Sequence, residues 1–523
     1  MNNSQNPLIP VIDVFAGPGG LGEGFSAFGH QEGKQYFKIE LSVEKECSSH
    51  STLELRSFFR QFSFDNVSED YYAFLRGEIT RDELYRRHPD EASAAKDEAW
   101  YATLGSGREF DKELDRRVSR IIDGHDRWIL IGGPPCQAYS VIGRSRNTGV
   151  KNYRPENDER YYLYREYLRI IARHRPSVFV MENVKGILSS QVQGSRIFDS
   201  ILADLQRPSS VFSQHHDDEP VRYKIFSLVK CPSIIQDNAR EGYAPEDFIV
   251  ECEKYGIPQA RHRVILLGVR EDISSVTPGI LLPEQEVYVE DVLEGLPELR
   301  SGLSKEADSV SVWHQRVSEI LGQKWLTIAR ELWGQDLFDQ LIHVLDNLKS
   351  PCHDRGDEYI PCDAPVRDDL RWWYMDTRLK GICNHVARGH MHKDIHRYLY
   401  ASCFAIQFGR SPKLHDYPAD LLPEHKNVKS GHFNDRFRVQ LYGHPSTTIT
   451  SHISKDGHYF IHPDPYQCRS LTVREAARLQ TFPDNYYFAG NRTQQYMQIG
   501  NAVPPLLAYK VASIVKDFLE AVR

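Results

Sequence analysis

The stretch VIDVFAGPGGLGEGF, residues 11–25, decides how the chain folds. Its β-branched, apolar start is typical of a buried strand, and the glycines that follow interrupt this pattern before a stretch compatible with a helix. Within it, GPGGLG (17–22) has the spacing G-x-G-x-x-G. Glycines at such a turn let the backbone approach a nucleoside closely, so the stretch predicts a strand, a ligand-binding turn and a helix.

Apolar, strand-like segments recur along the first half of the chain. They are YFKIELSVEKE (36–46), WILIGG (128–133), SVFVMENV (177–184), YKIFSLV (223–229) and HRVILLGV (262–269). Helical patterns separate some of them, as in 161–174, and residues 80–125 read as a charged, mostly helical insertion. Strands that alternate with helices predict an α/β fold with a doubly wound, mostly parallel sheet.

The regular alternation stops at about residue 275. Residues 275–465 have irregular spacing, several Pro and Gly residues and most of the His and Trp residues, so we expect a smaller, irregular domain there. Amphipathic helical patterns return at 470–482 and 506–522. We therefore expect residues 466–523 to rejoin the first domain, residues 1–274.

The composition is that of an ordinary globular protein, with 40% hydrophobic and 26% charged residues. The first residues lack the pattern of a signal peptide, and no run of about 18 apolar residues occurs, which predicts a cytoplasmic protein without a membrane span. Nine irregularly spaced cysteines do not indicate a disulfide framework. No metal is expected, because close Cys pairs are absent from the one cluster worth checking: Cys352, His353, Cys362, Cys383 and His385.

Reactive side chains stand next to three predicted strands. Cys136 follows 128–133, Glu182 ends 177–184, and Arg261 and Arg263 precede or begin 262–269. Because ligands of open α/β sheets bind beyond the carboxyl ends of strands, these groups predict nucleophilic attack on a polar ring. Taken alone, the glycine turn and Glu44 fit NAD, FAD or S-adenosylmethionine, and an inert Cys136 in a rigid turn stays possible.

Six segments resemble, in order, the motifs of the DNA (cytosine-5) methyltransferase family. They are DVFAGPGGLGEGF (13–25), GGPPCQAYS (132–140), MENVKG (181–186), YGIPQARHRVILLG (255–268), RSLTVREAARLQTFPD (469–484) and QIGNAVPPLLA (498–508). The resemblance covers most of the chain outside 80–125 and 275–440. It implies the sheet of S-adenosylmethionine-dependent methyltransferases and a role in bacterial restriction-modification or phage defence.

The same resemblance implies that S-adenosylmethionine binds at the glycine turn and leaves as S-adenosylhomocysteine. Glu44 would hold the ribose, Asn501 and Val503 would close the site, and RGEIT (76–80) resembles the family's adenine-binding motif, with Glu78 where aspartate is common. The implied cofactor contacts are Phe15, Ala16, Gly17, Gly19, Gly20, Leu21, Glu44, Glu78, Ile79, Pro134, Asn501 and Val503.

The resemblance also implies a covalent mechanism. The thiolate of Cys136 would add to carbon 6 of a cytosine flipped out of the duplex, which makes carbon 5 nucleophilic. Glu182 would act at N3 as a general acid, and Arg263, with Arg261, would hold O2 and a neighbouring phosphate. Residues 141–160 are expected to form a loop that closes over the base.

Residues 275–465 stand where the family has its target-recognition domain. Within them, 366–413 carry nine Lys and Arg against four Asp and Glu, a local excess that suits a phosphate backbone. The expected DNA contacts are Gln137, Ser140, Arg144, Gln259, Arg371, Arg378, Arg388, His390, Arg397, Arg410, Lys413, Thr447 and Thr448. Double-stranded DNA is the expected partner of a monomeric enzyme at the nucleoid, together with a cognate restriction nuclease or defence protein.

Three other functions are weighed against this one. The tRNA-modifying branch of the family has a short recognition region, whereas about 190 residues stand there in this chain. Methylation of exocyclic amino groups would need an Asn-Pro-Pro-aromatic type of motif, and DPY (464–466) lacks the second proline. A DNA-recognition protein without catalysis would not need the set Cys136, Glu182 and Arg263.

Overall fold

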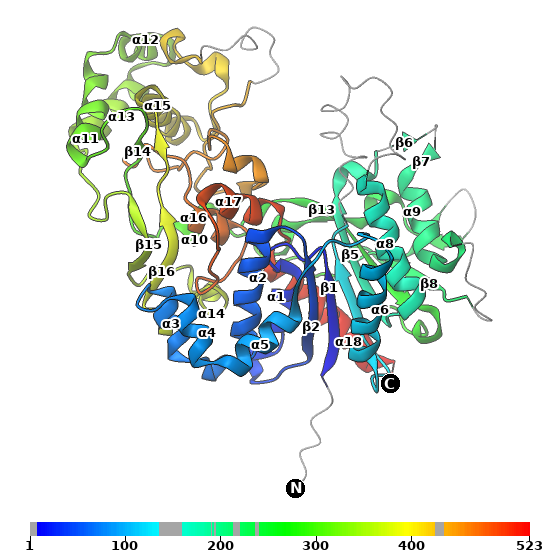
Figure 1. Ribbon diagram of the computed structural model, residues 1–523. Helices are drawn as coiled ribbons and strands as arrows, with labels where there is room; N and C mark the ends of the chain where they lie inside the picture. Colours follow the sequence, from blue (N-terminus) through cyan, green and yellow to red (C-terminus); the bar gives the residue numbers. More distant parts are fainter. Residues whose placement is uncertain are drawn as a thin grey trace.

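The computed structural model describes residues 8–134, 159–189, 191–192, 195–212, 220–235, 240–423 and 434–522 (Figure 1). An eight-stranded sheet forms the centre of the larger domain, in the order β11-β13-β5-β4-β1-β2-β3, with β8 also paired to β13. The strands are β1 (Ile9–Val14), β2 (Phe37–Glu44), β3 (Ala99–Tyr101), β4 (Ile129–Gly132), β5 (Val178–Val184), β8 (Tyr223–Phe226), β11 (Ile249–Glu251) and β13 (His262–Arg270).

The central strands run parallel, as the alternating pattern predicts. β1 pairs in parallel with β2 and β4, β4 with β5, and β2 with β3. β13 is antiparallel to β5, β8 and β11. The prediction of a mostly parallel α/β sheet is confirmed, and the reversal has a consequence: the amino end of β13 lies beside the carboxyl end of β5.

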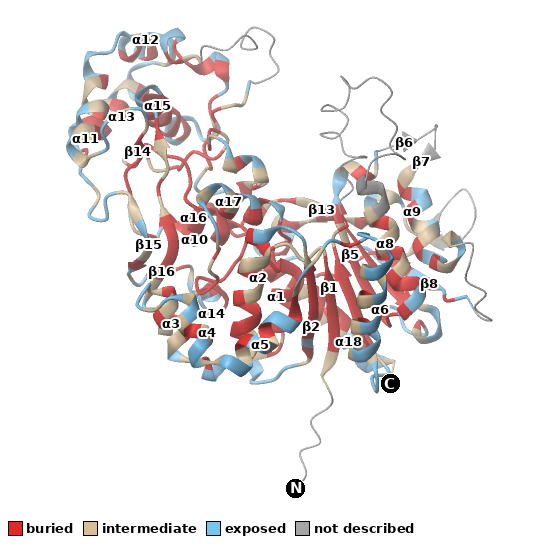
Figure 2. Ribbon diagram, in the orientation of Figure 1, coloured by how far each residue is buried: buried red, intermediate tan, exposed pale blue. Residues whose placement is uncertain are grey.

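Helices cover both faces of this sheet and bury its apolar strands (Figure 2). One core contains α1 (Gly20–Ala27) and α18 (Pro505–Ala521). The opposite core contains α6 (Arg108–Ile122), α8 (Glu159–His174) and α9 (Ile197–Gln206). The predicted helices at 161–174 and 506–522 are thus α8 and α18, and the doubly wound arrangement follows from apolar residues on both sides of each strand.

The predicted helical insertion also adds a strand to the sheet. It contains α4 (Arg81–Arg87), α5 (Pro89–Glu98) and α6, but β3 lies between α5 and α6 and pairs with β2. Upstream, α3 (Glu69–Leu75) packs with α4, α5 and α2 (Cys47–Arg60) in a separate apolar cluster. β3 escapes the sequence pattern because three residues are too few to show an alternation.

A smaller domain with its own core stands beside the larger one (Figure 1). Its helices are α11 (Val310–Ser318), α12 (Lys324–Trp333), α13 (Gln335–Asp346) and α15 (His392–Phe408). Residues 281–299 and 360–387 contribute instead to the core of the larger domain, as do α16 (Val473–Leu479) and α17 (Arg492–Asn501). Packing therefore divides the chain later than the boundary expected at residue 275.

Several short elements lie outside the central sheet. They are α10 (Val289–Leu293), β14 (Gly302–Leu303), β15 (Gly356–Pro361), α14 (Arg371–Tyr374), β16 (Gly381–Val386), β17 (Gly389–His390), β12 (Gln259–Ala260) and β18 (Ser446–Thr447). Among the residues described above, no helix is long and apolar enough to cross a membrane. The same residues contain no group of three or more His, Cys, Asp or Glu side chains arranged to hold a metal ion.

Candidate active site

The glycine turn at the end of β1 leaves an open space above its backbone. Phe15 and Gly17 adopt positive φ angles of 60° and 58°, and a Cβ atom on Gly17 would meet nothing within 4 Å. A Cβ on Gly19 would lie 2.8 Å from Leu53 Cδ1, and one on Gly20 would clash with the carbonyl oxygen of Val503. Gly17 thus frames a space, whereas Gly20 lets the segment after α17 close against α1.

Glu44 fixes the other side of this space. Its Oε2 accepts a hydrogen bond from Gly17 N at 2.8 Å, and its Oε1 accepts from Lys45 N and Glu46 N at 2.9 and 2.7 Å. Burial raises the pKa of this carboxyl above its ordinary value, although these three N–H groups oppose the shift. A carboxylate held beside an open glycine turn is suited to accept the hydroxyls of a ribose.

The remaining expected cofactor contacts differ in position. Val503 is buried against the turn, and Asn501 is exposed at the end of α17. Pro134 is buried next to β5, where its carbonyl oxygen accepts a hydrogen bond from Asn183 Nδ2 at 3.0 Å. Ala16 is half-buried in the turn, but Leu21 belongs to the apolar core below it.

The structure does not bring Glu78 and Ile79 to the end of β2. Glu78 follows α3, its Oε1 accepts a hydrogen bond from Arg76 Nε at 2.6 Å, and Ile79 packs in the cluster of α2 to α5. The residues beside Glu44 are instead Tyr101, which pairs with it across β2 and β3, and Ala102, whose N–H donates to Glu44 O at 3.0 Å. The sequence patterns did not predict that β3 and Ala102 lie beside Glu44. The short run AWYA (99–102) is the segment that forms this contact.

A carboxylate and a guanidinium meet at the carboxyl edge of the sheet. Arg263 Nε lies 2.9 Å from Glu182 Oε1, and these side chains are only 13% and 12% exposed. Arg263 Nη1 donates to His262 O at 2.8 Å, and a Cβ on Gly133 would lie 3.1 Å from Glu182 Oε2. Glu182 and Arg263, which the sequence places at neighbouring strand ends, thus form an ion pair beside the end of β4 that precedes Cys136 in the sequence.

Several expected site residues lie outside the described part of the chain. They are Cys136, Gln137, Ser140 and Arg144, with the expected loop up to residue 158. The described residues that flank this segment are Pro134, tied to Asn183, and α8. Asn183 is a contributor that the sequence patterns did not assign a role: its side chain joins the end of β5 to the segment leading toward Cys136.

Arg261 is buried and holds backbone carbonyls, which replaces the contact with a base expected for it. Its Nη1 donates to Ile449 O at 2.8 Å, its Nη2 donates to Ala502 O at 2.8 Å, and both lie 3.4 Å from Gly500 O. Burial, and then the charge of Arg263, lowers the pKa of Arg261 to about 9. Arg261 thus joins the segment around Asn501 to the segment that follows Thr447 and Thr448.

We expect the substitution Arg261→Met to lower the free energy of unfolding by about 2–4 kcal/mol, because it leaves buried carbonyls without their donor. Urea denaturation of the purified protein measures this loss. The control Arg116→Met removes an exposed arginine of α6 that pairs with Glu113 and should change stability by less than about 0.5 kcal/mol. Unchanged stability in Arg261→Met would show that Arg261 does not position these segments.

Several of the expected DNA contacts are engaged inside the protein instead. Gln259 is fully buried between Ile449 N and Leu479 O. Arg397 is buried and donates to Leu421 O at 2.7 Å, and His390 is buried within 3.1 Å of Ser470 Oγ. Arg378 pairs with Asp376 and donates to Phe64 O at 2.8 Å. The hydrogen bonds of Gln259, His390 and Arg397 are thus directed into the protein interior, whereas Arg378 is half-buried.

The other expected contacts stand closer to the surface. Arg371 is exposed on α14, and its neighbour Trp372 packs on Tyr509 of α18. Arg410 pairs with Asp416 at 2.7 Å, and Lys413 is exposed. Thr447 pairs with Ala260 across β18 and β12, and Thr448 Oγ1 donates to Ala260 O at 2.6 Å. The two threonines therefore lie directly beside the strand that leads to Arg261 and Arg263.

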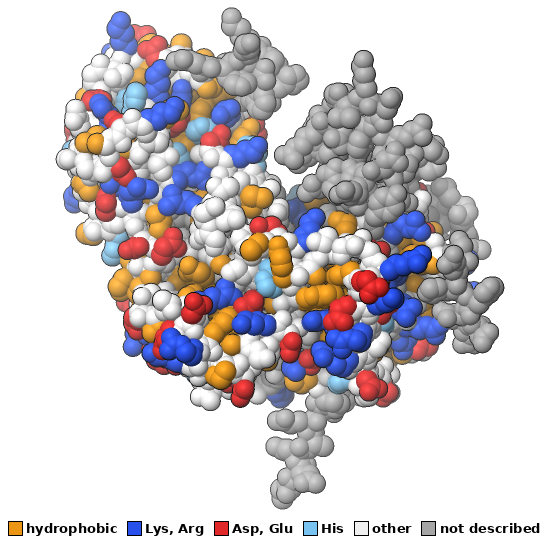
Figure 3. All heavy atoms as spheres, viewed as in Figure 1, with side chains coloured by type: hydrophobic (Ala, Val, Ile, Leu, Met, Phe, Trp, Pro, Cys, Tyr) orange, Lys and Arg blue, Asp and Glu red, His pale blue; other side chains and the backbone are white. Residues whose placement is uncertain are grey.

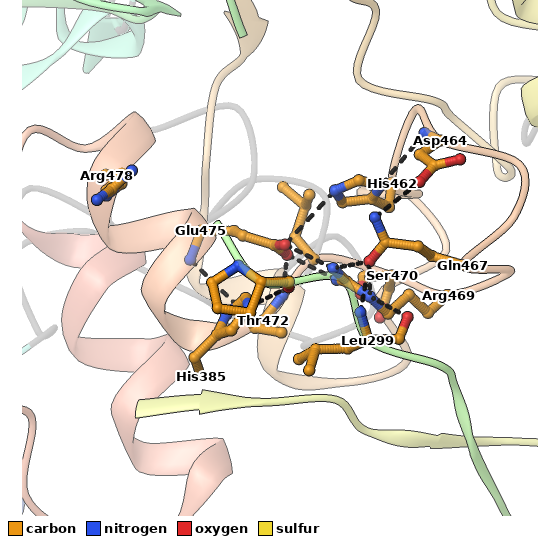
Figure 4. A network of polar contacts seen from close by, with 12 residues as sticks. Leu299, His385, His462, Asp464, Gln467, Arg469, Ser470, Thr472, Glu475 and Arg478 are labelled. Atoms are coloured by element: carbon orange, nitrogen blue, oxygen red, sulfur yellow. Dashed lines mark hydrogen bonds and ion pairs between the residues drawn. The ribbon is translucent and has the colours of Figure 1, made fainter. Parts of the chain in front are cut away.

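A fully buried polar network lies behind α16 (Figure 4). Arg469 Nη1 donates to Glu475 Oε2 at 2.7 Å, and His462 Nε2 lies 3.5 Å from Glu475 Oε1. His385 Nδ1 lies 2.9 Å from Thr472 Oγ1, while its Nε2 lies 2.9 Å from Pro297 O. The network joins residues near 299, β16 and the segment 462–475, so it holds together three segments that are far apart in the sequence.

The chain is similar to several known proteins. The sequence model of the family described as C-5 cytosine-specific DNA methylase matches residues 102–208 and 229–517. The chain is 32% identical to type II methyltransferase M.Bpa9945I of Bacillus paralicheniformis over 97% of its own length and 99% of the relative's. It is 27% identical to type II methyltransferase M.DdeI of Desulfomicrobium norvegicum, covering 98% and 90%. The solved Entamoeba histolytica methyltransferase EhMeth is 12% identical, covers 98% of this chain and 99% of its own, and has a TM-score of 0.43.

Proposed function

The chain belongs to the C-5 cytosine-specific DNA methylase family, and from that premise we propose that it methylates carbon 5 of cytosine in double-stranded DNA through a covalent bond to Cys136. The observation that carries the proposal is the ion pair of Glu182 and Arg263 at the carboxyl edge of the sheet. This ion pair lies beside Gly133, which follows β4 and precedes Cys136 in the sequence. β4 pairs with β1, the strand that ends at the glycine turn.

The residues at the glycine turn fit S-adenosylmethionine. Gly17 leaves space for a nucleoside, and the carboxylate of Glu44 faces the same turn. Asn501 and Val503 approach from α17, and Tyr101 and Ala102 offer an edge beside Glu44 for the adenine. S-adenosylmethionine, when bound, supplies an electrophilic methyl group.

The side chains have complementary tasks on the cytosine ring. The sulfur of Cys136 forms a bond to carbon 6, and the electron pair displaced onto the ring makes carbon 5 nucleophilic. Glu182 hydrogen-bonds or protonates N3, which stabilises the ring during addition, and Arg263 holds O2 with its fixed positive charge. After methylation, a base removes the carbon 5 proton, the electron pair of that bond re-forms the double bond between carbons 5 and 6, and the carbon 6–sulfur bond breaks to return Cys136 as a thiolate.

The target base must leave the helix for this chemistry, because carbon 6 is not accessible to a side chain within a stacked duplex. Residues 141–160 are proposed to close over the extruded base, and the smaller domain to select the sequence around it. The relatives named above are type II methyltransferases, which favours a bacterial restriction-modification role beside a cognate nuclease. S-adenosylhomocysteine is then the product.

Transfer of tritium from labelled S-adenosylmethionine tests the proposal. We expect label on carbon 5 of cytosine in duplex DNA and none on tRNA. A duplex in which every cytosine is already 5-methylcytosine is the matched control and should take up no label. Label on tRNA, or on the fully methylated duplex, would contradict cytosine-5 methylation of DNA, and no label on any substrate would favour a binding protein without catalysis.

A further inference from the structure

Arg388 and Arg492 lie next to Tyr496 where α17 meets the smaller domain, and a third arginine, Arg355, lies close to Arg492. The guanidinium of Arg388 lies over the Tyr496 ring, 4.6 Å from its centroid, and its Nη2 donates to Ile453 O at 2.8 Å. Arg492 is the first residue of α17, and Arg355 directly precedes β15. Tyr496 comes four residues after Arg492 on α17, so Arg492 lies on the helix face over which Arg388 sits, and the charges of Arg388 and Arg355 oppose its own.

The positive charge of this cluster is incompletely balanced. Arg355 has an acid partner, Asp308, at 2.5 Å. Arg388 is bound to a carbonyl oxygen and an aromatic face, and Arg492 has neither a hydrogen bond nor an ion pair with any residue in the described part of the chain. Glu358 is the acidic group that acts on Arg492, and it is exposed and bonded to Asn384 Nδ2.

Burial makes this arrangement costly in the free protein. Arg492 is half-buried, and its pKa is lowered by burial and then by the charges of Arg355 and Arg388, although Tyr496 opposes the shift. Neighbouring cations that are partly removed from water are unfavourable unless an anion joins them. The cluster therefore has the electrostatic character of an anion site.

The arginine cluster and the proposed cofactor site lie at opposite ends of α17. α17 runs from Arg492 to Asn501, so at 1.5 Å per residue its ends are about 14 Å apart. Ile453, which binds Arg388, belongs to the segment that starts at Thr447 and Thr448 beside β12.

We propose that Arg388 and Arg492, supported by Arg355, bind a backbone phosphodiester of the DNA duplex a few base pairs from the target cytosine. The inference rests on the proposed function, because it takes duplex DNA as the substrate. A guanidinium offers forked donors that match phosphate oxygens, and such contacts position DNA without reading its sequence. Figure 3 shows Lys and Arg side chains over the visible face of the smaller domain, with Asp and Glu side chains among them.

The substitution Arg492→Gln tests this site with little risk to the fold, because it removes no internal hydrogen bond. We expect duplex binding to weaken several-fold and the slope of log affinity against log salt to fall by about one unit, equally on target and non-target duplexes. We also expect an unchanged or higher Tm, since a half-buried unpaired cation is removed. Arg492→Lys, which keeps the charge, should retain most of the salt slope.

The control Arg116→Gln makes the same change of charge on an exposed arginine of α6, which pairs with Glu113, and should leave the slope unchanged. An unchanged slope in Arg492→Gln would overturn the inference, as would a loss confined to the target sequence. A lowered Tm together with normal DNA binding would also overturn it by showing a structural role. Because the readout is binding, a wild-type protein that binds DNA but transfers no methyl group would contradict the proposed function alone.

Discussion

Cys136→Ala is expected to reduce methyl transfer to duplex DNA to the background rate while leaving DNA binding intact. Carbon 5 of cytosine is too electron-poor to accept an electrophilic methyl group directly, and addition of a thiolate to carbon 6 is what makes it nucleophilic. Glu182 and Arg263 can polarise the ring from the edge of the sheet, but neither supplies this electron pair. Removal of the thiol therefore removes the reaction path and does more than slow it.

Two measurements separate this result from a folding defect. Wild-type protein should form a stable covalent adduct with a duplex that carries 5-fluorocytosine at the target, because fluorine cannot leave carbon 5 as a proton does. Cys136→Ala should form none, although its affinity for the same duplex is normal. The control Cys352→Ala, at an exposed cysteine in the loop before β15, should trap DNA and transfer methyl groups like the wild type. Methyl transfer that survives in Cys136→Ala would exclude the thiolate mechanism.

The buried strands, and the position of Glu182 and Arg263 at neighbouring strand ends, could be predicted from the sequence because both depend on local pattern. Buried strands are legible as apolar runs, and residues at strand ends are brought to one edge by the rules of α/β folds. The sequence could thus place Glu182 and Arg263 near one another, but it did not show how the strand that carries Arg263 runs. Arg263 reaches the carboxyl edge because β13 runs antiparallel to β5, a direction that periodicity does not reveal.

The roles of Arg261 and Gln259 could not be predicted because they depend on what packs over them. Both residues share a motif with Arg263, yet the carbonyls of Ile449 and Ala502 come from segments about 190 and 240 residues further along the chain. The charge of Arg397 likewise predicts a contact with DNA, but its side chain is buried and donates to Leu421 O. Arg492 could not be predicted as a functional residue either, because a single arginine in a polar helix has no distinctive pattern. The reason to propose a phosphate contact for it is the charge of Arg355 and Arg388 nearby.

The buried network behind α16 leads to the largest expected effect on stability. Arg469 and Glu475 are each only 1% exposed, so Glu475→Gln leaves the Arg469 cation in the interior without its counter-charge. We expect this substitution to lower the free energy of unfolding by about 3–5 kcal/mol, measured by urea denaturation at pH 7.5. Glu113→Gln, which breaks the surface pairs with Arg116 and Arg117, is the matched control and should cost less than about 1 kcal/mol.

The same network should make the wild-type protein sensitive to acid. Burial lowers the pKa of His385 and of His462 to about 4, so the unfolded chain takes up these two protons near pH 6.5 while the folded chain does not. Burial alone would raise the pKa of Glu475, but Arg469 outweighs it and the net shift is downward, so protonation below about pH 4.5 also favours the unfolded chain. Stability should therefore be greatest above pH 6.5 and fall by several kcal/mol toward pH 4. A urea midpoint that stays constant from pH 7.5 to pH 5 would contradict neutral, buried histidines, because each must then be protonated equally in both states.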